Sequence, residues 1–534
     1  MAKRYRGIIG DYNLLSPDDM NDILFSPFQQ ALGVETFERI QKQLSNYDYY
    51  SGKQHIDPRT GQLVKAKELE RPPGFDYKPT RYATNYFKAI VDRKARWQMG
   101  GTHGISVPRK QIDDIADVIA EGYTPSDAQR KENRRAEDYE QLLYKLWDEN
   151  KMRARLTQAA RDRLIADRVV CKIVFNQQTG KLRWIFRPDS EFIPVYSDDD
   201  FEDLIGAHFV KARKWEVKGN EVDAIQLQSF RLIDGQAWLE ETILRESDLK
   251  LLKTVVKLSP MGLDFLPVQT FPVDELLAES LGESEISDLR EQNDRLNQLN
   301  EDAIDSLKFE MFPMTAVLNA TVGTAEQMEV SPGAVVEARG HTDGQTPDIK
   351  KVESGFRWRE AFKDQYARVK AAMHEISGLP QIVPQELNFG GLNGEALQIL
   401  FHDIITDTEE HWLSWGYNLS ELHEKSIRYL QARTDSDKFA YDKPVIREIG
   451  DEYTNEMRFV LPLPDNRKEL VELLDLESAA GFESTKGAIE RLGVENVQAK
   501  VQEIESERSR QRSDSDPYRE EAIGGDDDGR TDVQ

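Results

Sequence analysis

The stretch that decides the fold runs from Gly355 to Gln431. It reads GFRWREAFKDQYARVKAAMHEISG (355–378), then LPQIVPQELNFGGLNG (379–394), then EALQILFHDIITDTEEHWLSWGYNLSELHEKSIRYLQ (395–431). Apolar residues recur every three or four positions in the first segment, which predicts a helix with one apolar face. Gly378 and Pro380 end this helix, because glycine accepts the left-handed cap and proline cannot continue the hydrogen-bond ladder.

The middle segment is predicted to be a loop, and the third a second, very long helix. Prolines and glycines are spread through residues 379–394, and no helix can cross them. Asn393 can cap the helix that follows. Apolar residues from Leu397 to Leu430 follow helical spacing. We therefore expect a helix, a loop and a long helix that joins distant parts of a large particle.

This order of segments resembles the tailed-bacteriophage portal proteins of the SPP1-like class. The resemblance rests on SGLP (377–380), on GLNGEAL (391–397) and on the long helix after it. A second stretch matches the family run N-x-x-x-x-I-V-D-x-K, with these residues in one register: Asn85, Ile90, Val91, Asp92, Lys94 and, after it, Gly100. Tyr49, Tyr50 and Gly52 fit a tyrosine–glycine pattern of the same family, although an ordinary aromatic helix end has the same pattern.

Composition describes a polar protein of several domains. The chain has 534 residues, of which 39% are hydrophobic and 31% charged, with no signal peptide and no apolar run of membrane-spanning length. Its one cysteine, Cys171, excludes an internal disulfide and a multi-cysteine metal site, and VVCKIVF around it predicts a buried strand. The net charge of −26 fits either an acidic protein without nucleic acid or a conduit that surrounds DNA without binding it tightly.

The fold class is predicted to be α+β. Residues 169–246 read as an antiparallel sheet with hairpin turns at Asn176–Gly180 and Asp234-Gly235, and helices lie beside it. Two helices are expected at about 135–149 and 152–167, after a charged insertion at 108–135. Strand-like runs at 309–354 lie between two amphipathic helices, and residues 444–464 read as a hairpin.

The resemblance implies a portal fold with a wing, a helical stem, a small β-rich clip, a long spar helix and a helical crown. The segments that it assigns are 1–279, N-terminal region and wing; 280–308, stem helix; 309–354, clip; 355–378, stem helix; 379–394, tunnel loop; 395–463, wing spar helix and hairpin; 464–512, crown; and 513–534, a disordered acidic tail.

A search for chemistry predicts no catalytic residue, no metal site and no cofactor. The loop Gly390–Gly394 opens a helix but lacks the Gly-Lys-Ser/Thr ending of a nucleotide-binding loop. His402, Asp403, Asp407 and His411 lie along one helix, yet the two histidines are more than two turns apart and cannot share one ion on a straight helix. The acidic turn Asp198–Asp200 is interpreted as a solvated loop.

The function that the resemblance implies is that of a phage portal: a channel ring at one capsid vertex for packaging, retaining and ejecting double-stranded DNA. The implied partners are other copies of the chain in a dodecamer, the DNA, terminase, head-completion or adaptor proteins, and the major capsid and scaffolding proteins, with no membrane. The implied location is the virion, after assembly in the host cytoplasm. By this interpretation the chain is not an enzyme.

Two sets of site residues follow from the resemblance. The tunnel loop would present to DNA the residues Gln385, Glu386, Leu387, Asn388, Phe389 and Asn393. The clip would present to partner proteins the residues Met311, Phe312, Met314 and Val317. Two alternatives stay open: another ring-forming virion component, such as a head–tail adaptor or tail protein, and a nucleic-acid enzyme, which would need an acidic cluster that the sequence does not assemble.

Overall fold

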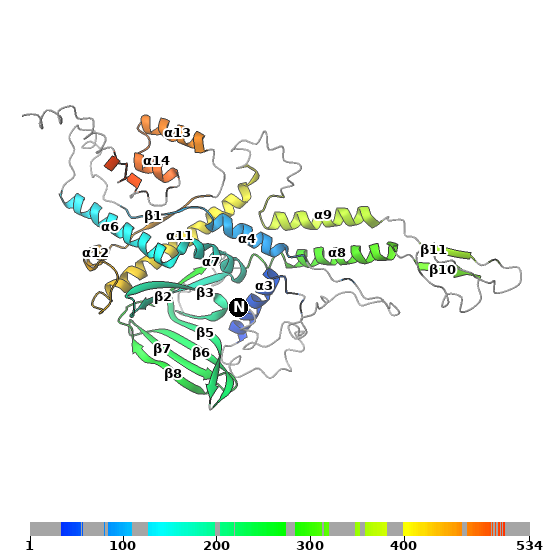
Figure 1. The fold of residues 1–534 in the computed structure, drawn as a ribbon, viewed down its shortest axis with the longest axis horizontal. Coiled ribbons are helices and arrows are strands. Elements are labelled where there is room, and N and C mark those ends of the chain that lie inside the picture. Colours follow the sequence, from blue (N-terminus) through cyan, green and yellow to red (C-terminus); the bar gives the residue numbers. More distant parts are fainter. Residues whose placement is uncertain are drawn as a thin grey trace, which may run out of the picture.

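The chain forms a body of helices and antiparallel sheets from which a long arm projects (Figure 1). The structure is a computed structural model. It describes residues 34–54, 56, 80, 84–108, 127–197, 203–217, 219–273, 284–311, 314–319, 346, 348–352, 358–381, 399–461, 467–492 and parts of 494–507. Helices and antiparallel sheets together confirm the predicted α+β class. None of the described helices has the length and apolar character that a membrane-spanning segment needs.

The strands predicted as one sheet divide into two. The smaller sheet has the order β3-β2-β9, with the strands Arg168–Asn176 (β2), Lys181–Pro188 (β3) and Val268–Pro272 (β9). The larger sheet runs in sequence order, with the strands Phe192–Tyr196 (β4), Leu204–Val217 (β5), Asn220–Ile233 (β6), Gln236–Arg245 (β7) and Leu251–Pro260 (β8). A short 3₁₀ turn at Asp189–Glu191 separates β3 from β4 and redirects the chain between the sheets. Both predicted hairpin turns are confirmed, and Asp234 and Gly235 have the positive φ values, 50° and 73°, of a tight hairpin turn.

The main core forms where helices pack on the smaller sheet. The helices of the body are Val34–Tyr50 (α3), Tyr86–Met99 (α4), Asp127–Asn150 (α6), Met152–Ala166 (α7) and His402–Gln431 (α11). Strand β2 contacts both α7 and α11 and is buried along most of its length. Cys171 lies fully buried in β2, and burial raises the pKa of its thiol, so the prediction of a structural cysteine is confirmed. The helix α3 packs on the larger sheet, where Phe37, Ile40 and Leu44 meet Val210 and Ile225.

Three predicted helix boundaries differ from the structure. In the stem helix predicted at 280–308, residues 285–289 form a turn, and the helix (α8) spans Arg290–Met311. The helix α6 begins at Asp127, within the predicted insertion 108–135. Most residues of its first turns have good helix propensity, but they carry no apolar stripe from which a helix could be predicted. The long helix predicted from Glu395 is interrupted at Phe401. Ile399 and Leu400 are helical, Phe401 forms a turn whose ring packs against Trp97 with centroids 5.3 Å apart, and α11 begins at His402. From there α11 runs without interruption through Gly416.

The prediction of a hairpin at residues 444–464 is wrong. Residues Lys443–Ile449 form a helix (α12), in which Pro444 occupies the first turn, where proline is well tolerated. The later strand Glu456–Phe459 (β12) pairs instead with His103–Ser106 (β1), from which it is far apart in sequence. Ile446 and Ile449 are buried, so burial of an apolar helix face decides the conformation of this segment.

The arm consists of two antiparallel helices with two strands at its end: Arg290–Met311 (α8), Met314–Leu318 (β10), Asp348–Val352 (β11) and Trp358–Ile376 (α9). Figure 1 shows α8 and α9 side by side, leading away from the body to β10 and β11. At the other end of the chain, Arg467–Ala479 (α13) and Thr485–Arg491 (α14) are helices within the segment 464–512, which is predicted to be helical. The acidic tail 513–534 and the turn 198–200 lie outside the described residues.

A buried histidine connects α11 to the body. His423 is fully buried, and its Nε2 accepts a hydrogen bond from Trp147 Nε1 at 2.7 Å. Because an indole N–H can only donate, the ring proton lies on Nδ1, which is 2.7 Å from the Asn455 side-chain oxygen and donates to it. Burial lowers the pKa of His423 to about 4, so the ring is neutral at neutral pH.

This pKa predicts a specific pH dependence. The unfolded chain binds a proton to His423 below about pH 6.5, whereas the folded chain resists it down to about pH 4. The stability contributed by the neutral ring is therefore present above pH 6.5 and is lost as pH falls towards 4, by about 1.4 kcal/mol per pH unit. The variant His423→Gln cannot be protonated. Its free energy of unfolding is measured with denaturant from pH 7 to 4.5. Over the range below pH 6.5 it is expected to fall less steeply than that of the unchanged protein, with a slope smaller by about 1.4 kcal/mol per pH unit. Equal slopes would contradict the assignment.

Candidate functional site

The root of the arm joins two of the stretches on which the family resemblance rests, Tyr49–Gly52 and the run that begins at Asn85. Tyr50 at the end of α3 accepts a hydrogen bond on its backbone oxygen from the Asn85 amide at 2.8 Å, and its hydroxyl donates to Asp92 at 2.9 Å. Tyr49 donates to Asp294 of α8 at 2.7 Å. Gly52 has φ 66°, and an added Cβ would lie 3.1 Å from the Asn85 amide nitrogen. These tyrosines therefore belong to a packed joint at the base of the arm, and not to an ordinary exposed helix end.

The first turn of α4 holds both helices of the arm. Asn85 caps α4 by accepting a hydrogen bond from the backbone N–H of Lys88 at 3.1 Å. The N–H of Thr84 donates to the side chain of Asn297 in α8 at 2.8 Å, and the hydroxyls of Tyr86 and Tyr366 in α9 lie 2.8 Å apart. One helix end thus fixes the positions of α8 and α9 relative to the body.

Further along α4, Lys94 forms the charged centre of the root. Its side chain is 4% exposed, and its ammonium lies 2.7 Å from a carboxylate oxygen of Glu285 and 3.2 Å from one of Asp407. Burial acts to lower the pKa of Lys94, but the two carboxylates raise it above its ordinary value. Glu285 precedes α8 and Asp407 lies in α11, so one ammonium connects three elements.

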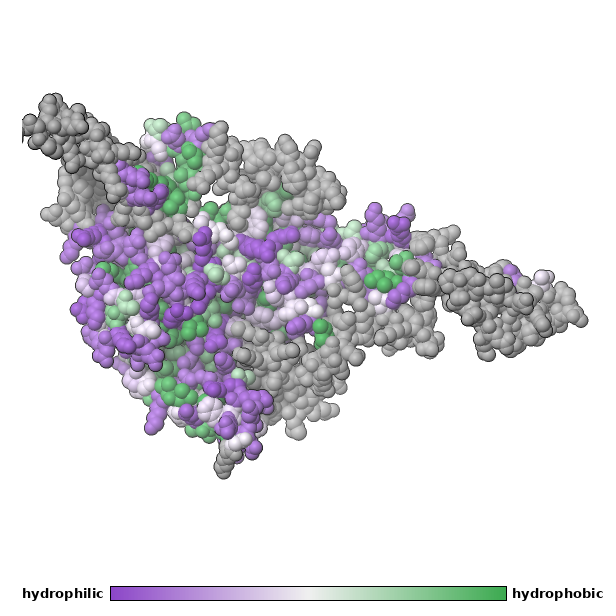
Figure 2. All heavy atoms as spheres, viewed as in Figure 1, coloured by the Kyte–Doolittle hydropathy of each residue, from purple (hydrophilic) through white to green (hydrophobic). Residues whose placement is uncertain are grey.

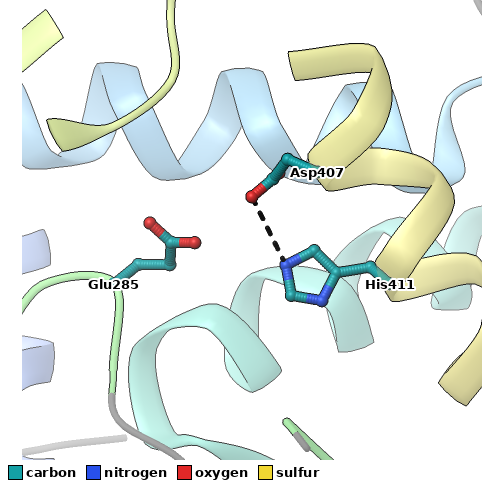
Figure 3. A group of neighbouring side chains, drawn as sticks. All are labelled: Glu285, Asp407 and His411. Atoms are coloured by element: carbon teal, nitrogen blue, oxygen red, sulfur yellow. Dashed lines mark ion pairs between the residues drawn. The ribbon is translucent and has the colours of Figure 1, made fainter. Parts of the chain in front are cut away.

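Glu285, Asp407 and His411 also have the composition of a metal site. Their ligand atoms lie within 4.8 Å of one another, and Figure 3 shows them converging from two segments of the chain. The ammonium of Lys94 already lies against both carboxylates and would repel a divalent cation there. Burial, with Arg163 and Lys94 adding to it, lowers the pKa of His411 to about 3. We interpret the group as an ion-pair cluster.

The four residues considered as metal ligands from the sequence, His402, Asp403, Asp407 and His411, do not form one cluster. His402 and Asp403 are exposed at the start of α11 and are absent from the cluster that contains Asp407 and His411. The structure brings Glu285 to Asp407 from 122 positions earlier in the chain, which helical spacing alone could not indicate. A stronger signal in the sequence was Lys94 itself, because a lysine on the same helix line as Tyr86 and Ile90 requires a buried partner.

The predicted apolar stripe of α9 faces α8 but is only partly covered. Met373 is buried, whereas Trp358, Phe362, Tyr366 and Val369 are partly buried. Trp358 Nε1 donates to Glu310 Oε1 at 3.0 Å, which fixes the register of the two antiparallel helices. Leu307 and Ile376 remain 43% and 46% exposed, and Figure 2 shows hydrophobic residues exposed on the arm among hydrophilic ones. The arm therefore presents apolar surface that the single chain does not bury.

The end of the arm contains part of the predicted clip. Met311 is the last residue of α8, and Met314 and Val317 lie in β10, paired with Val352 and Ile349 of β11. Phe312 lies outside the described residues, as do 320–345. The structure thus places three of the four predicted partner-binding residues at one end of the molecule.

The predicted tunnel loop lies outside the described residues from 382 to 398, including all six residues predicted to face DNA. Both sides of it are anchored. On the α9 side, Gly378 has φ 63°, as predicted for the cap, and Leu379 is buried with its N–H donating to the His374 oxygen at 3.1 Å. On the α11 side, Phe401 packs on Trp97. The segment therefore begins and ends at the root of the arm.

An open groove of about 770 Å³ lies elsewhere, beside α11. Acidic residues dominate its lining: Asp264, Glu421, Glu424 and Asp451. Arg428 in the same lining is paired with Asp264 at 2.8 Å and Glu424 at 3.1 Å. Arg428 is thus already paired with two of the four acids that line the groove.

A family model described as phage portal protein, SPP1 Gp6-like, matches residues 35–514. Three solved structures show low similarity. The neck of an empty gene transfer agent (GTA) particle with C6 symmetry is 13% identical, with 76% of this chain and 89% of that chain covered and a TM-score of 0.37. The native GTA virion is 13% identical, with 64% of this chain and 80% of that chain covered and a TM-score of 0.29. The native GTA neck with C12 symmetry is 12% identical, with 76% of this chain and 89% of that chain covered and a TM-score of 0.31. No curated protein matches it.

Proposed function

Because this chain belongs to the SPP1 Gp6-like phage portal protein family, we propose that its copies form a closed dodecameric ring whose central channel conducts double-stranded DNA. The family is one of structural virion components and not of enzymes. The observation that supports the proposal best is the arm, a pair of helices that leads from the body to a small β-structured end. Head–tail adaptors and tail proteins lack such an insert, which favours a portal over these alternatives.

The segments receive the following proposed roles. The body supplies the wing, from residues 1–279 and 395–463, with α11 as its spar. The arm helices belong to the stem segments 280–308 and 355–378, and β10 and β11 to the clip, 309–354. Residues 379–394 form the tunnel loop and residues 464–512 the crown. The exposed apolar side chains Leu307 and Ile376 on the arm agree with neighbouring copies that cover them.

The tunnel loop would contact DNA sterically. Its sequence PQELNFGGLNG has one acid, Glu386, and no base, so it cannot form ion pairs with phosphates. Polar and apolar tips would surround the axis: Gln385, Glu386, Leu387, Asn388, Phe389 and Asn393. The glycines would let each copy shift, so that the ring could follow a DNA helix of different symmetry. Anchoring of both ends of the loop at the root supports a tip that moves while its base stays in place.

The clip would bind the proteins that act on the channel from outside, terminase during packaging and head-completion proteins afterwards, while the body would meet the major capsid and scaffolding proteins. Assembly would take place in the host cytoplasm before the ring becomes part of the virion. Met311, Phe312, Met314 and Val317 would supply adaptable apolar side chains for such binding.

Exchanging residues 309–354 for a short flexible linker is expected to abolish terminase or adaptor binding. The physical reason is that, among the described residues, β10 and β11 follow and precede the arm helices α8 and α9 and pair with each other, so loss of this segment should remove a binding surface without unfolding the wing. Binding is measured by co-sedimentation, and the thermal midpoint of unfolding serves as the control, expected to stay within a few degrees. Unchanged binding with the segment removed would place the interface elsewhere.

Light scattering tests ring formation itself. We expect a species many times the mass of the 61.3 kDa chain, because a heterologous interface whose rotation closes yields one ring of fixed size. A mass of one or two chains over a wide concentration range would contradict the proposed assembly.

A further inference from the structure

One ammonium group at the root of the arm serves two carboxylates from different elements. Lys94 Nζ lies 2.7 Å from Glu285 and 3.2 Å from Asp407, and the lysine side chain is 4% exposed. The carboxylates are 22% and 28% exposed, so all three groups are largely shielded from water. At such a site an ion pair is stronger than at an open surface. Removing one carboxylate therefore changes the interaction energy between the ammonium and the other carboxylate.

The two carboxylates belong to different structural parts, the arm and the long helix α11. Glu285 lies directly before α8, the first helix of the arm. Asp407 lies in the second turn of α11, which follows residues 382–398. Lys94 belongs to α4, whose first turn also holds α9 through Tyr86 and Tyr366. The ammonium is therefore located where the arm and the start of α11 meet.

Lys94 is paired with both acids. His411 Nε2 is 4.0 Å from Asp407, but its depressed pKa keeps the ring neutral above about pH 3. The second carboxylate oxygen of Asp407, Oδ2, has no hydrogen-bond partner. Asp407 would thus gain from closer contact with the ammonium, and it competes for that contact with Glu285.

We propose that Lys94 couples the arm energetically to the start of α11, because Glu285 and Asp407 compete for its one ammonium. Weakening either ion pair strengthens the other, and the coupling is reciprocal, as linkage requires. Lys94 acts as a positioning residue. That this coupling connects a DNA-contacting loop to the stem rests on the proposed function; the coupling itself does not.

Hydrogen–deuterium exchange on the full chain tests the coupling with near-isosteric variants. In Glu285→Gln, amide exchange in residues 402–408 of α11 is expected to slow about tenfold, the scale of one charge-assisted hydrogen bond. In Asp407→Asn, exchange in residues 402–408 is expected to accelerate, while exchange in residues 286–293 at the arm root slows. A purely structural role would accelerate exchange near each substitution and protect nothing on the other element.

One further variant completes the design. The matched control is Asp403→Asn, an exposed acid one turn from Asp407 in α11, which should leave residues 286–293 unchanged.

Exchange in Glu285→Gln that changes only at the arm root would overturn the inference. The same holds if Asp407→Asn leaves exchange in residues 286–293 unchanged. Neither outcome depends on ring formation, so a chain that showed the coupling but formed no ring would contradict the proposed function alone.

Discussion

Replacing Asp189 with alanine is expected to lower the free energy of unfolding by about 3–5 kcal/mol, the cost of breaking a buried ion pair by removing one partner. Asp189 is 0% exposed and lies in the turn between the two sheets. It accepts a hydrogen bond from Arg168 Nε at 2.6 Å, another from Gln43 Nε2 at 2.7 Å, and a third from Arg39. Without it, the guanidinium of Arg168, itself 1% exposed, would remain buried without its carboxylate.

The effect is measured by denaturant unfolding of the purified protein. Asp189→Asn, which keeps the shape and one acceptor oxygen, should be destabilised less than the alanine variant. Asp437→Ala, at an exposed position without an ion pair in the described chain, should stay within about 0.5 kcal/mol of the unchanged protein. Similar losses for Asp189→Ala and Asp437→Ala would show that the buried network does not connect α3 to the sheets energetically.

Stiffening the proposed tunnel loop, residues 379–394, is expected to abolish the filling of phage heads with DNA while leaving ring assembly intact. In Gly390→Pro with Gly391→Pro, each proposed tunnel loop would lose the backbone freedom that glycine provides and that a tip following the DNA helix would need. Three quantities are measured: ring assembly, DNA packaged per head and DNA retained. We expect normal rings and loss of most packaged or retained DNA.

A charge-neutralised loop is the matched control. Glu386→Gln removes the one acid of the loop without changing its length, and because the proposed contact is steric, packaging should be unchanged. Normally filled heads from the double proline variant would refute the tunnel-loop assignment but not the family assignment. Loss of packaging in Glu386→Gln would instead indicate an electrostatic contact.

Local elements could be predicted from the sequence where their pattern is repetitive. The apolar stripe of α9, the glycine cap at Gly378 and the hairpin turn at Asp234-Gly235 depend on residues close in the chain, and the structure confirms them. Sequence pattern was misleading at residues 444–464, where alternation suggested strands although burial of Ile446 and Ile449 favours a helix.

The contacts of the arm root could not be predicted, because they join residues that are far apart in sequence. Tyr86 and Tyr366 are 280 positions apart, and Lys94 and Asp407 are 313 apart. The resemblance indicated that residues near Asn85 and Tyr49 matter, but not that they pack against each other and against α8. Only the folded chain reveals why these residue types occur together.

The central claim is that this chain builds a channel ring, and electron microscopy of the purified protein tests it most directly. Images of negatively stained particles, averaged by class, should show closed rings with an axial hole in end views and a narrow projection, formed by the bundled arms, in side views. Particles without rotational symmetry, or rings without an axial hole, would contradict the account.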